Sequence, residues 1–128
     1  PPGNSPDTAP AAFGAIAVPV LAATGSADGS QLAQGRSLAE VVAARASVFA
    51  ALPASRTGAG HVGLWLDGAT HADFGGSAGP RQTPDAHVVA VTTAATTAFF
   101  TAHLAGAGRP DLSAAQALLR PGDRISRK

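Results

Sequence analysis

The chain of 128 residues contains no cysteine and no methionine, and its only lysine is its last residue, Lys128. The absence of cysteine excludes disulfide bonds, thiolate metal sites and a cysteine nucleophile. Because translation begins at methionine, a chain that starts at Pro1 and has no methionine is expected to be a trimmed or cleaved part of a longer protein. Its length suits one domain with one hydrophobic core.

Charged residues are scarce, at 13% of the chain, and the formal net charge is +1. Nucleic-acid binding requires a basic stripe with aromatic platforms. The arginines are scattered instead, and only residues 120–128 are locally basic, so we expect no nucleic-acid partner. No apolar run approaches the length of a bilayer-spanning segment, so we expect no membrane span.

The two ends of the chain differ in composition from its middle. Residues 1–12 are polar and proline-rich and are expected to form a linker or an irregular segment. Residues 121–128 are expected to be a frayed basic tail, which leaves residues 13–120 as the folded part. No signal peptide is visible. The low lysine content and the proline-rich start suit a secreted bacterial enzyme, and the compartment is otherwise open.

Two short apolar runs predict β-strands, one within residues 15–24 and one over residues 61–66. Neither run alternates between apolar and polar residues, which is typical of strands buried on both faces of a parallel sheet. Pro19 places the first strand at an edge or makes it begin near that proline.

Three stretches predict helices, namely residues 38–52, 84–104 and 113–119. Ser37 and Glu40 have the spacing of a capping box for the first helix. Thr83, followed by a proline, is the expected N-cap of the second helix. The predicted buried stripe of this long helix consists of Val88, Val91, Ala95, Phe99 and Leu104.

The order strand–helix–strand–helix–helix predicts an α/β fold, with a mostly parallel sheet and helices packed on it. Two strands are too few for a stable parallel sheet, because buried parallel strands need neighbours on both sides. We therefore expect this fold to be incomplete on its own and to form part of a larger domain.

Polar residues that could carry chemistry follow both predicted strands. Asp28 lies on the loop after the first strand, and His71 lies on the loop after the second. In open α/β sheets, ligands bind at the carboxyl ends of the strands. An aspartate that accepts a hydrogen bond from one imidazole nitrogen leaves the other nitrogen free to take a proton from a serine. Asp28 and His71 are therefore predicted to be the acid and the general base of a catalytic triad.

The chain resembles the C-terminal part of an α/β-hydrolase over roughly residues 16–119. The resemblance depends on three motifs, which are Val18-Pro19-Val20-Leu21 before Asp28, Gly68-Ala69-x-His71, and the pair Phe99-Phe100 on the last long helix. It is similar to the dienelactone-hydrolase, chlorophyllase-like and polyester-hydrolase branches. The resemblance implies a serine esterase that acts on small-molecule or polymeric carboxylic esters without a cofactor. Asp28 would be its acid and His71 its base.

The nucleophile elbow of this family, Gly-x-Ser-x-Gly between a strand and a helix, is missing upstream of Asp28. The resemblance therefore implies a partner, the N-terminal part of the same protein, that supplies the elbow and the oxyanion hole. Residues 75–79 spell the motif around Ser77, but they follow a loop, and Pro80 comes next. We predict that this chain alone is inactive. A non-catalytic α/β interaction or regulatory module is the alternative function.

Several other residues have candidate binding roles. Phe74 is a candidate substrate-binding residue that could line an acyl pocket, or it could pin the loop after His71. A metal site made of His71, Asp73 and Asp67 has no supporting His-x-x-x-His spacing, and the two aspartates are more simply turn formers, so we expect no metal. The remaining histidines are expected to pack or to be solvated, and they are His61, His87 and His103.

Overall fold

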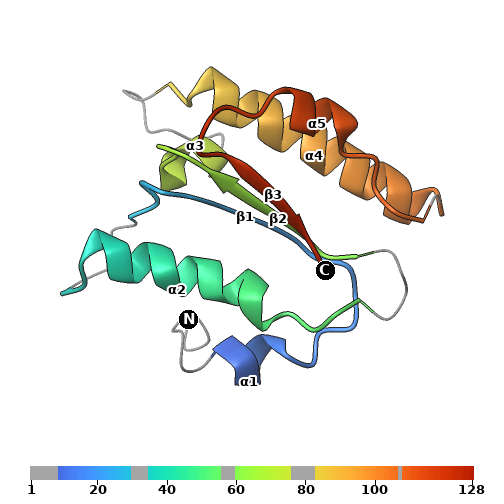
Figure 1. The fold of residues 1–128 in the computed structure, drawn as a ribbon, viewed down its shortest axis with the longest axis horizontal. Helices are drawn as coiled ribbons and strands as arrows, with labels where there is room; N and C mark the ends of the chain where they lie inside the picture. The colour runs from blue at the N-terminus through green and yellow to red at the C-terminus, as the bar shows by residue number, and fades with distance from the viewer. Residues whose placement is uncertain (1–8, 30–34, 56–59, 76–82, 107) are drawn as a thin grey trace.

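The computed structural model describes residues 9–29, 35–55, 60–75, 83–106 and 108–128, which fold around a three-stranded sheet (Figure 1). The strands are β1 (Leu21–Gly25), β2 (Val62–Leu66) and β3 (Arg124–Arg127), in that order across the sheet. The predicted α/β class, with helices packed on a sheet, is confirmed for the described residues. β1 and β2 are parallel, as predicted, whereas β3 runs antiparallel to β2.

The sheet is the middle one of three layers (Figure 1). The layer above it in the figure holds α4 and α5, and the layer below holds α2 with α1 beside it. The short helix α3 lies near the carboxyl ends of β1 and β2. The helices among the described residues are α1 (Ala9–Phe13), α2 (Leu38–Ala51), α3 (His71–Gly75), α4 (Ala86–Leu104) and α5 (Ser113–Ala117).

The prediction of a frayed C-terminal tail is wrong, because Arg124–Arg127 forms β3. Leu64 lies opposite Ile125 in the register, and Ile125 packs against the core. Beyond the strand, the backbones of His61 and Lys128 exchange two hydrogen bonds of 2.7 and 3.0 Å. The basic composition concealed this strand because strand pairing uses backbone groups and does not depend on which side chains the strand carries.

The N-terminal segment and the helix starts also differ in part from the predictions. The capping box of Ser37 and Glu40 is present at the start of α2, as predicted. α4, however, is capped by Asp85 rather than by Thr83. The helix α1 lies within the segment that was expected to be irregular, and α3 begins at His71, where a loop was expected. Both helices have only five residues, too few for a clear apolar period.

The hydrophobic core lies between the sheet and α4. One cluster joins Val62 and Leu64 of β2 to Phe99 of α4 and to Leu112, and a second cluster surrounds Leu66. The predicted buried stripe of α4 is confirmed except at its last member, since Leu104 is 82% exposed. Within the described ranges, no helix is long and apolar enough to cross a membrane.

A buried carboxylate, Asp123, ties three segments together beside this core. Its oxygens accept hydrogen bonds from the backbone N–H groups of Asp67 and Arg120 and lie 2.7 Å from Nε2 of His87. Burial raises the pKa of Asp123, but these N–H donors and the His87 ring outweigh burial and lower the pKa below its ordinary value. The carboxylate thus links the end of β2, the first turn of α4 and the turn that leads into β3.

The Asp123→Ala variant is expected to lower the free energy of unfolding by about 2 to 3 kcal/mol, because it removes the acceptor shared by two backbone N–H groups and the His87 ring. Asp111→Ala is the matched control, since Asp111 is exposed and accepts a hydrogen bond from the N–H of Ser113. The control should lose about 1 kcal/mol or less. Chemical denaturation followed by circular dichroism measures both losses. Equal losses in the two variants would contradict the linking role of Asp123.

His61 is buried at the start of β2, with 1% of its surface exposed. Burial and the nearby Lys128 ammonium lower its pKa from the ordinary value of 6.5, against an opposing hydrogen bond to the backbone of Pro53. As the pH falls below 6.5, the unfolded chain therefore binds a proton that the folded chain does not. This histidine contributes stability that is fully present above that pH and is lost as the pH falls toward the lowered pKa.

The His61→Asn variant is therefore expected to show a smaller loss of unfolding free energy between pH 7.5 and 5.5 than the unmodified chain. Urea denaturation at several pH values measures this difference. The carboxylates with lowered pKa values, Asp73 and Asp123, titrate below this window and are unchanged in the comparison. Parallel curves for the two proteins would show that burial does not lower the pKa of His61.

Candidate active site

The carboxyl ends of β1 and β2 deliver Asp28 and His71 to the same edge of the sheet. Because the two strands are parallel and paired, with Gly25 opposite Leu66, the loops that follow them start side by side. A hydrogen bond from the N–H of Ala27 to the carbonyl of Ala69 joins the two loops. This contact brings Asp28 and His71, which are 43 positions apart in the sequence, into one cluster.

Nδ1 of His71 lies 3.2 Å from Oδ1 of Asp28. Asp28 is buried, whereas the His71 side chain is 64% exposed. The two atoms are within ion-pair distance but are not aligned as a hydrogen bond, and Oδ1 has no hydrogen bond from the described residues. The structure thus brings together the two residues predicted from the sequence, one as a buried carboxylate and the other as an accessible ring.

Two further side chains hold Asp28, and no sequence motif predicted either of them. Thr24 donates a hydrogen bond of 3.1 Å from its hydroxyl group to Oδ2, and Nη1 of Arg45 lies 3.3 Å from the same oxygen. A buried carboxylate is costly unless it is paired, and Arg45 supplies the opposite charge. Two sequence features could have indicated these contacts. They are a threonine at the end of the strand and a single arginine within an alanine-rich helix.

Arg45 also lies 3.4 Å from Nδ1 of His71, so this nitrogen has two neighbours of opposite kind. Arginine only donates hydrogen bonds and would require a lone pair on Nδ1, whereas the Asp28 carboxylate only accepts and would require Nδ1–H. The contact with Arg45 has hydrogen-bond geometry, whereas the contact with Asp28 does not. A ring with Nδ1–H would instead donate to the free Oδ1 of Asp28, while Arg45 and Thr24 remain on Oδ2. In that tautomer, Nε2 of His71 carries the lone pair and can accept a proton.

Asp73 fixes the short helix that begins with His71. One carboxylate oxygen accepts hydrogen bonds from the hydroxyl and N–H groups of Thr70, and the other accepts from the N–H of Asp85. The Thr70 hydroxyl, followed by the N–H groups of Asp85 and Thr70, lowers the pKa of Asp73 below its ordinary value. The predicted turn-forming role of Asp73 is therefore confirmed, and the carboxylate connects the His71 segment to the start of α4.

Phe74 packs against the cluster around Leu66, Val88 and Val91. Phe74 therefore pins the loop after His71, which is one of the two roles that the sequence suggested. A role for Phe74 in binding an acyl group stays a prediction. Ser77 lies outside the described residues. The remaining histidines have packing roles, since His61 is buried, His87 pairs with Asp123, and His103 lies edge-to-face on Phe99 at 4.4 Å.

Metal binding has no support in the described part of the chain, where no group of three or more His, Asp or Glu side chains is arranged to hold an ion. The carboxylate of Asp73 is occupied by hydrogen bonds from the loop, and Asp67 accepts a hydrogen bond of 2.7 Å from the Ser26 hydroxyl. Both aspartates therefore stabilise turns, as the sequence analysis favoured.

Comparisons with known proteins identify no family for this chain. No protein-family model matches it, and neither does any curated protein or any solved structure. Any functional assignment therefore depends on the residues and the geometry described above.

The close approach of the two loops requires glycine at position 25. A Cβ atom at Gly25 would lie 2.2 Å from the carbonyl oxygen of Ala69, so the Gly25→Ala variant should lose about 2 to 3 kcal/mol of unfolding free energy. Gly75→Ala is the control, because a Cβ atom there meets nothing within 4 Å and alanine favours a helix. Thermal and urea denaturation compare the variants. A Gly25→Ala protein as stable as the control would contradict this contact.

Proposed function

We propose that this chain carries the acid and the general base of a serine esterase of the α/β-hydrolase type, which acts on carboxylic esters. Asp28 is the acid and His71 is the base, and the nucleophilic serine lies in an N-terminal part of the protein outside these 128 residues. The single observation that carries the proposal is the pairing of a buried carboxylate with an accessible imidazole, 3.2 Å apart, at the carboxyl ends of two adjacent parallel strands.

In this proposal, His71 moves protons at Nε2 while Asp28 holds the ring through Nδ1–H. Nε2 takes the proton of the serine hydroxyl as the serine oxygen attacks the ester carbonyl, and the protonated ring then gives this proton to the departing alkoxide. A water molecule, deprotonated by the same nitrogen, next attacks the acyl-enzyme. The bond between the acyl carbon and the serine oxygen breaks, the ring returns the proton to the serine oxygen, and the carboxylic acid is released. Arg45 and Thr24 keep Asp28 in place, and Asp28 stabilises the positive charge on the ring.

The location of the serine outside the chain is supported by the helix that precedes Ser77. A nucleophile elbow requires a strand directly before the Gly-x-Ser-x-Gly motif. Here the motif begins at Gly75, the last residue of α3. A helix in place of the strand argues against Ser77 as the nucleophile, and the proposal therefore expects a strand–Gly-x-Ser-x-Gly–helix segment before Pro1 in the longer polypeptide.

The proposal is tested with the longer polypeptide and p-nitrophenyl esters of short acids. His71→Ala and Asp28→Ala should each lower kcat/KM by about 10³- to 10⁴-fold, because residues of a triad act as a unit. His103→Ala is the control, since His103 packs on Phe99 in α4 and should leave kcat/KM nearly unchanged. A fluorophosphonate probe should label one serine of the unmodified enzyme before Pro1.

Three outcomes would contradict the proposal. They are unchanged turnover in the His71→Ala variant, labelling of Ser77, and a longer polypeptide without the Gly-x-Ser-x-Gly segment. In each case, the cluster of Asp28, Arg45 and His71 would be a structural ion-pair network. The chain would then fit the alternative of a non-catalytic interaction or regulatory module.

A further inference from the structure

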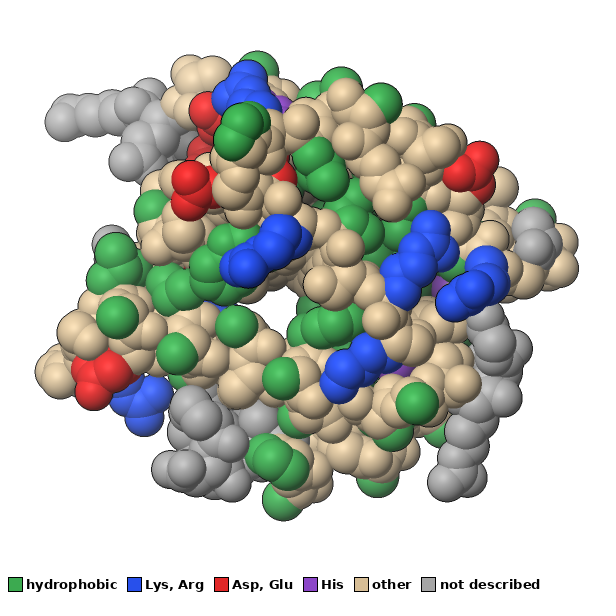
Figure 2. Space-filling view, viewed as in Figure 1, with side chains coloured by type: hydrophobic (Ala, Val, Ile, Leu, Met, Phe, Trp, Pro, Cys, Tyr) green, Lys and Arg blue, Asp and Glu red, His purple; other side chains and the backbone are tan. Residues whose placement is uncertain are grey.

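A cavity of about 400 Å³ lies between α2 and the sheet, on the face opposite α4. Figure 2 shows an opening between these two layers. It exists because small residues occupy this face of the sheet, among them Ala22 of β1 and Gly63 of β2. Protein interiors are normally close-packed, and a cavity of this size falls in the range of small-molecule sites. The cavity is therefore large enough to hold a small molecule.

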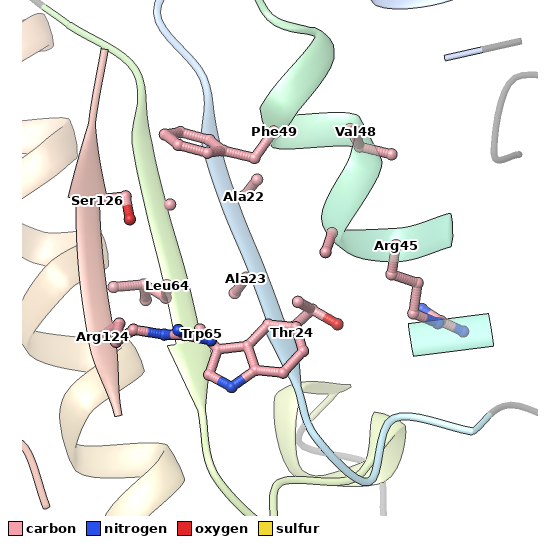
Figure 3. Close-up of a pocket in the computed structure, with 12 residues that line it drawn as sticks. Ala22, Ala23, Thr24, Arg45, Val48, Phe49, Leu64, Trp65, Arg124 and Ser126 are labelled. Carbon is pink, nitrogen blue, oxygen red and sulfur yellow. The ribbon is translucent and has the colours of Figure 1, made fainter. Parts of the chain in front are cut away.

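The cavity has apolar and aromatic walls, with polar side chains from β1, α2 and β3 at its border (Figure 3). Phe49 of α2 and Trp65 of β2 supply the apolar surface. Arg124 and Ser126 of β3 line the same cavity, as expected for residues two positions apart on a strand. An apolar chamber with a few convergent polar groups is the usual form of a ligand site.

The charged side chains that line this cavity favour an anionic ligand. No acidic side chain lines it. The Arg124 guanidinium lies 5.4 Å from the centre of the Trp65 ring and has no carboxylate partner among the described residues. The second cation on the wall, Arg45, is already paired with Asp28. Arg124 thus remains available, and a guanidinium can donate two parallel hydrogen bonds to a carboxylate.

We propose that this cavity binds an apolar monocarboxylate, such as the anion of a medium-chain fatty acid. Its carboxylate lies on Arg124 and Ser126, and its apolar body lies between Phe49 and Trp65. Binding at this site does not require the esterase activity, because Asp28 and His71 do not line the cavity. Arg45 and Thr24 line both the cavity and the Asp28 cluster, so an occupied cavity touches the side chains that position the proposed acid.

Trp65 is the only tryptophan of the chain, so its fluorescence reports directly on the cavity. Decanoate, kept below the concentration at which it forms micelles, should change this fluorescence in a saturable way with one molecule bound per chain. Decanol and decylamine should bind at least tenfold more weakly, because neither offers a carboxylate to Arg124. Isothermal titration calorimetry on the longer polypeptide measures the same affinity without relying on a single tryptophan.

Two arginine variants separate the cavity from general charge effects. Arg124→Gln should raise the Kd for decanoate by roughly ten- to a hundredfold, the usual effect of losing a charged hydrogen-bond partner. Arg127→Gln is the matched control on the same strand, because Arg127 donates to the carbonyl of Pro110 and does not line the cavity. It should leave the Kd unchanged. Ala46→Leu, which adds volume to the cavity wall, should also weaken binding.

The His71→Ala variant should bind decanoate as the unmodified chain does, so a failure of the esterase proposal leaves this result intact. The cavity proposal is overturned by the absence of saturable binding, by equal affinity for decanoate and decanol, or by equal effects of the two arginine variants. A dimer that excludes decanoate in sedimentation would show that a second copy covers it.

Discussion

The parallel pairing of β1 with β2 is the constraint on which the rest of this structure depends. It starts both loops at one edge of the sheet, and the hydrogen bond from Ala27 to Ala69 then holds them in contact. Only glycine fits at position 25, because any Cβ atom would overlap the backbone of Ala69. The packing of the two backbones therefore brings Asp28 and His71 close together.

The two faces of the sheet are filled in different ways. The side chains of Val62, Leu64 and Leu66 anchor the closely packed side against α4. On the other face, Gly63 offers no side chain, and the ring of Phe49 in α2 lies directly over it. Residues that alternate along a strand point to opposite faces, so one short strand builds a core on one side and leaves a cavity on the other.

Charge pairing connects the candidate active site to this cavity. A buried carboxylate such as Asp28 requires hydrogen-bond donors and an opposite charge, and α2 supplies the charge through Arg45. Arg45 also lines the cavity, whereas Arg124, on the far strand, has no carboxylate among the described residues. The two arginines thus have different roles, one stabilising the proposed acid and the other open to a ligand.

The sequence by itself determined the two parallel strands, the capped helix α2, the long helix α4, and the positions of Asp28 and His71 just after the strands. These features depend on local signals, namely apolar runs, caps and the rule that sites lie at the carboxyl ends of strands. Only the tertiary structure decided that the basic tail forms β3, that Asp123 binds His87, and that Arg45 reaches Asp28. Each of these contacts joins residues at least 17 positions apart. A local sequence pattern does not indicate which distant donor will bind a buried carboxylate, or which distant segment will pair with a strand edge.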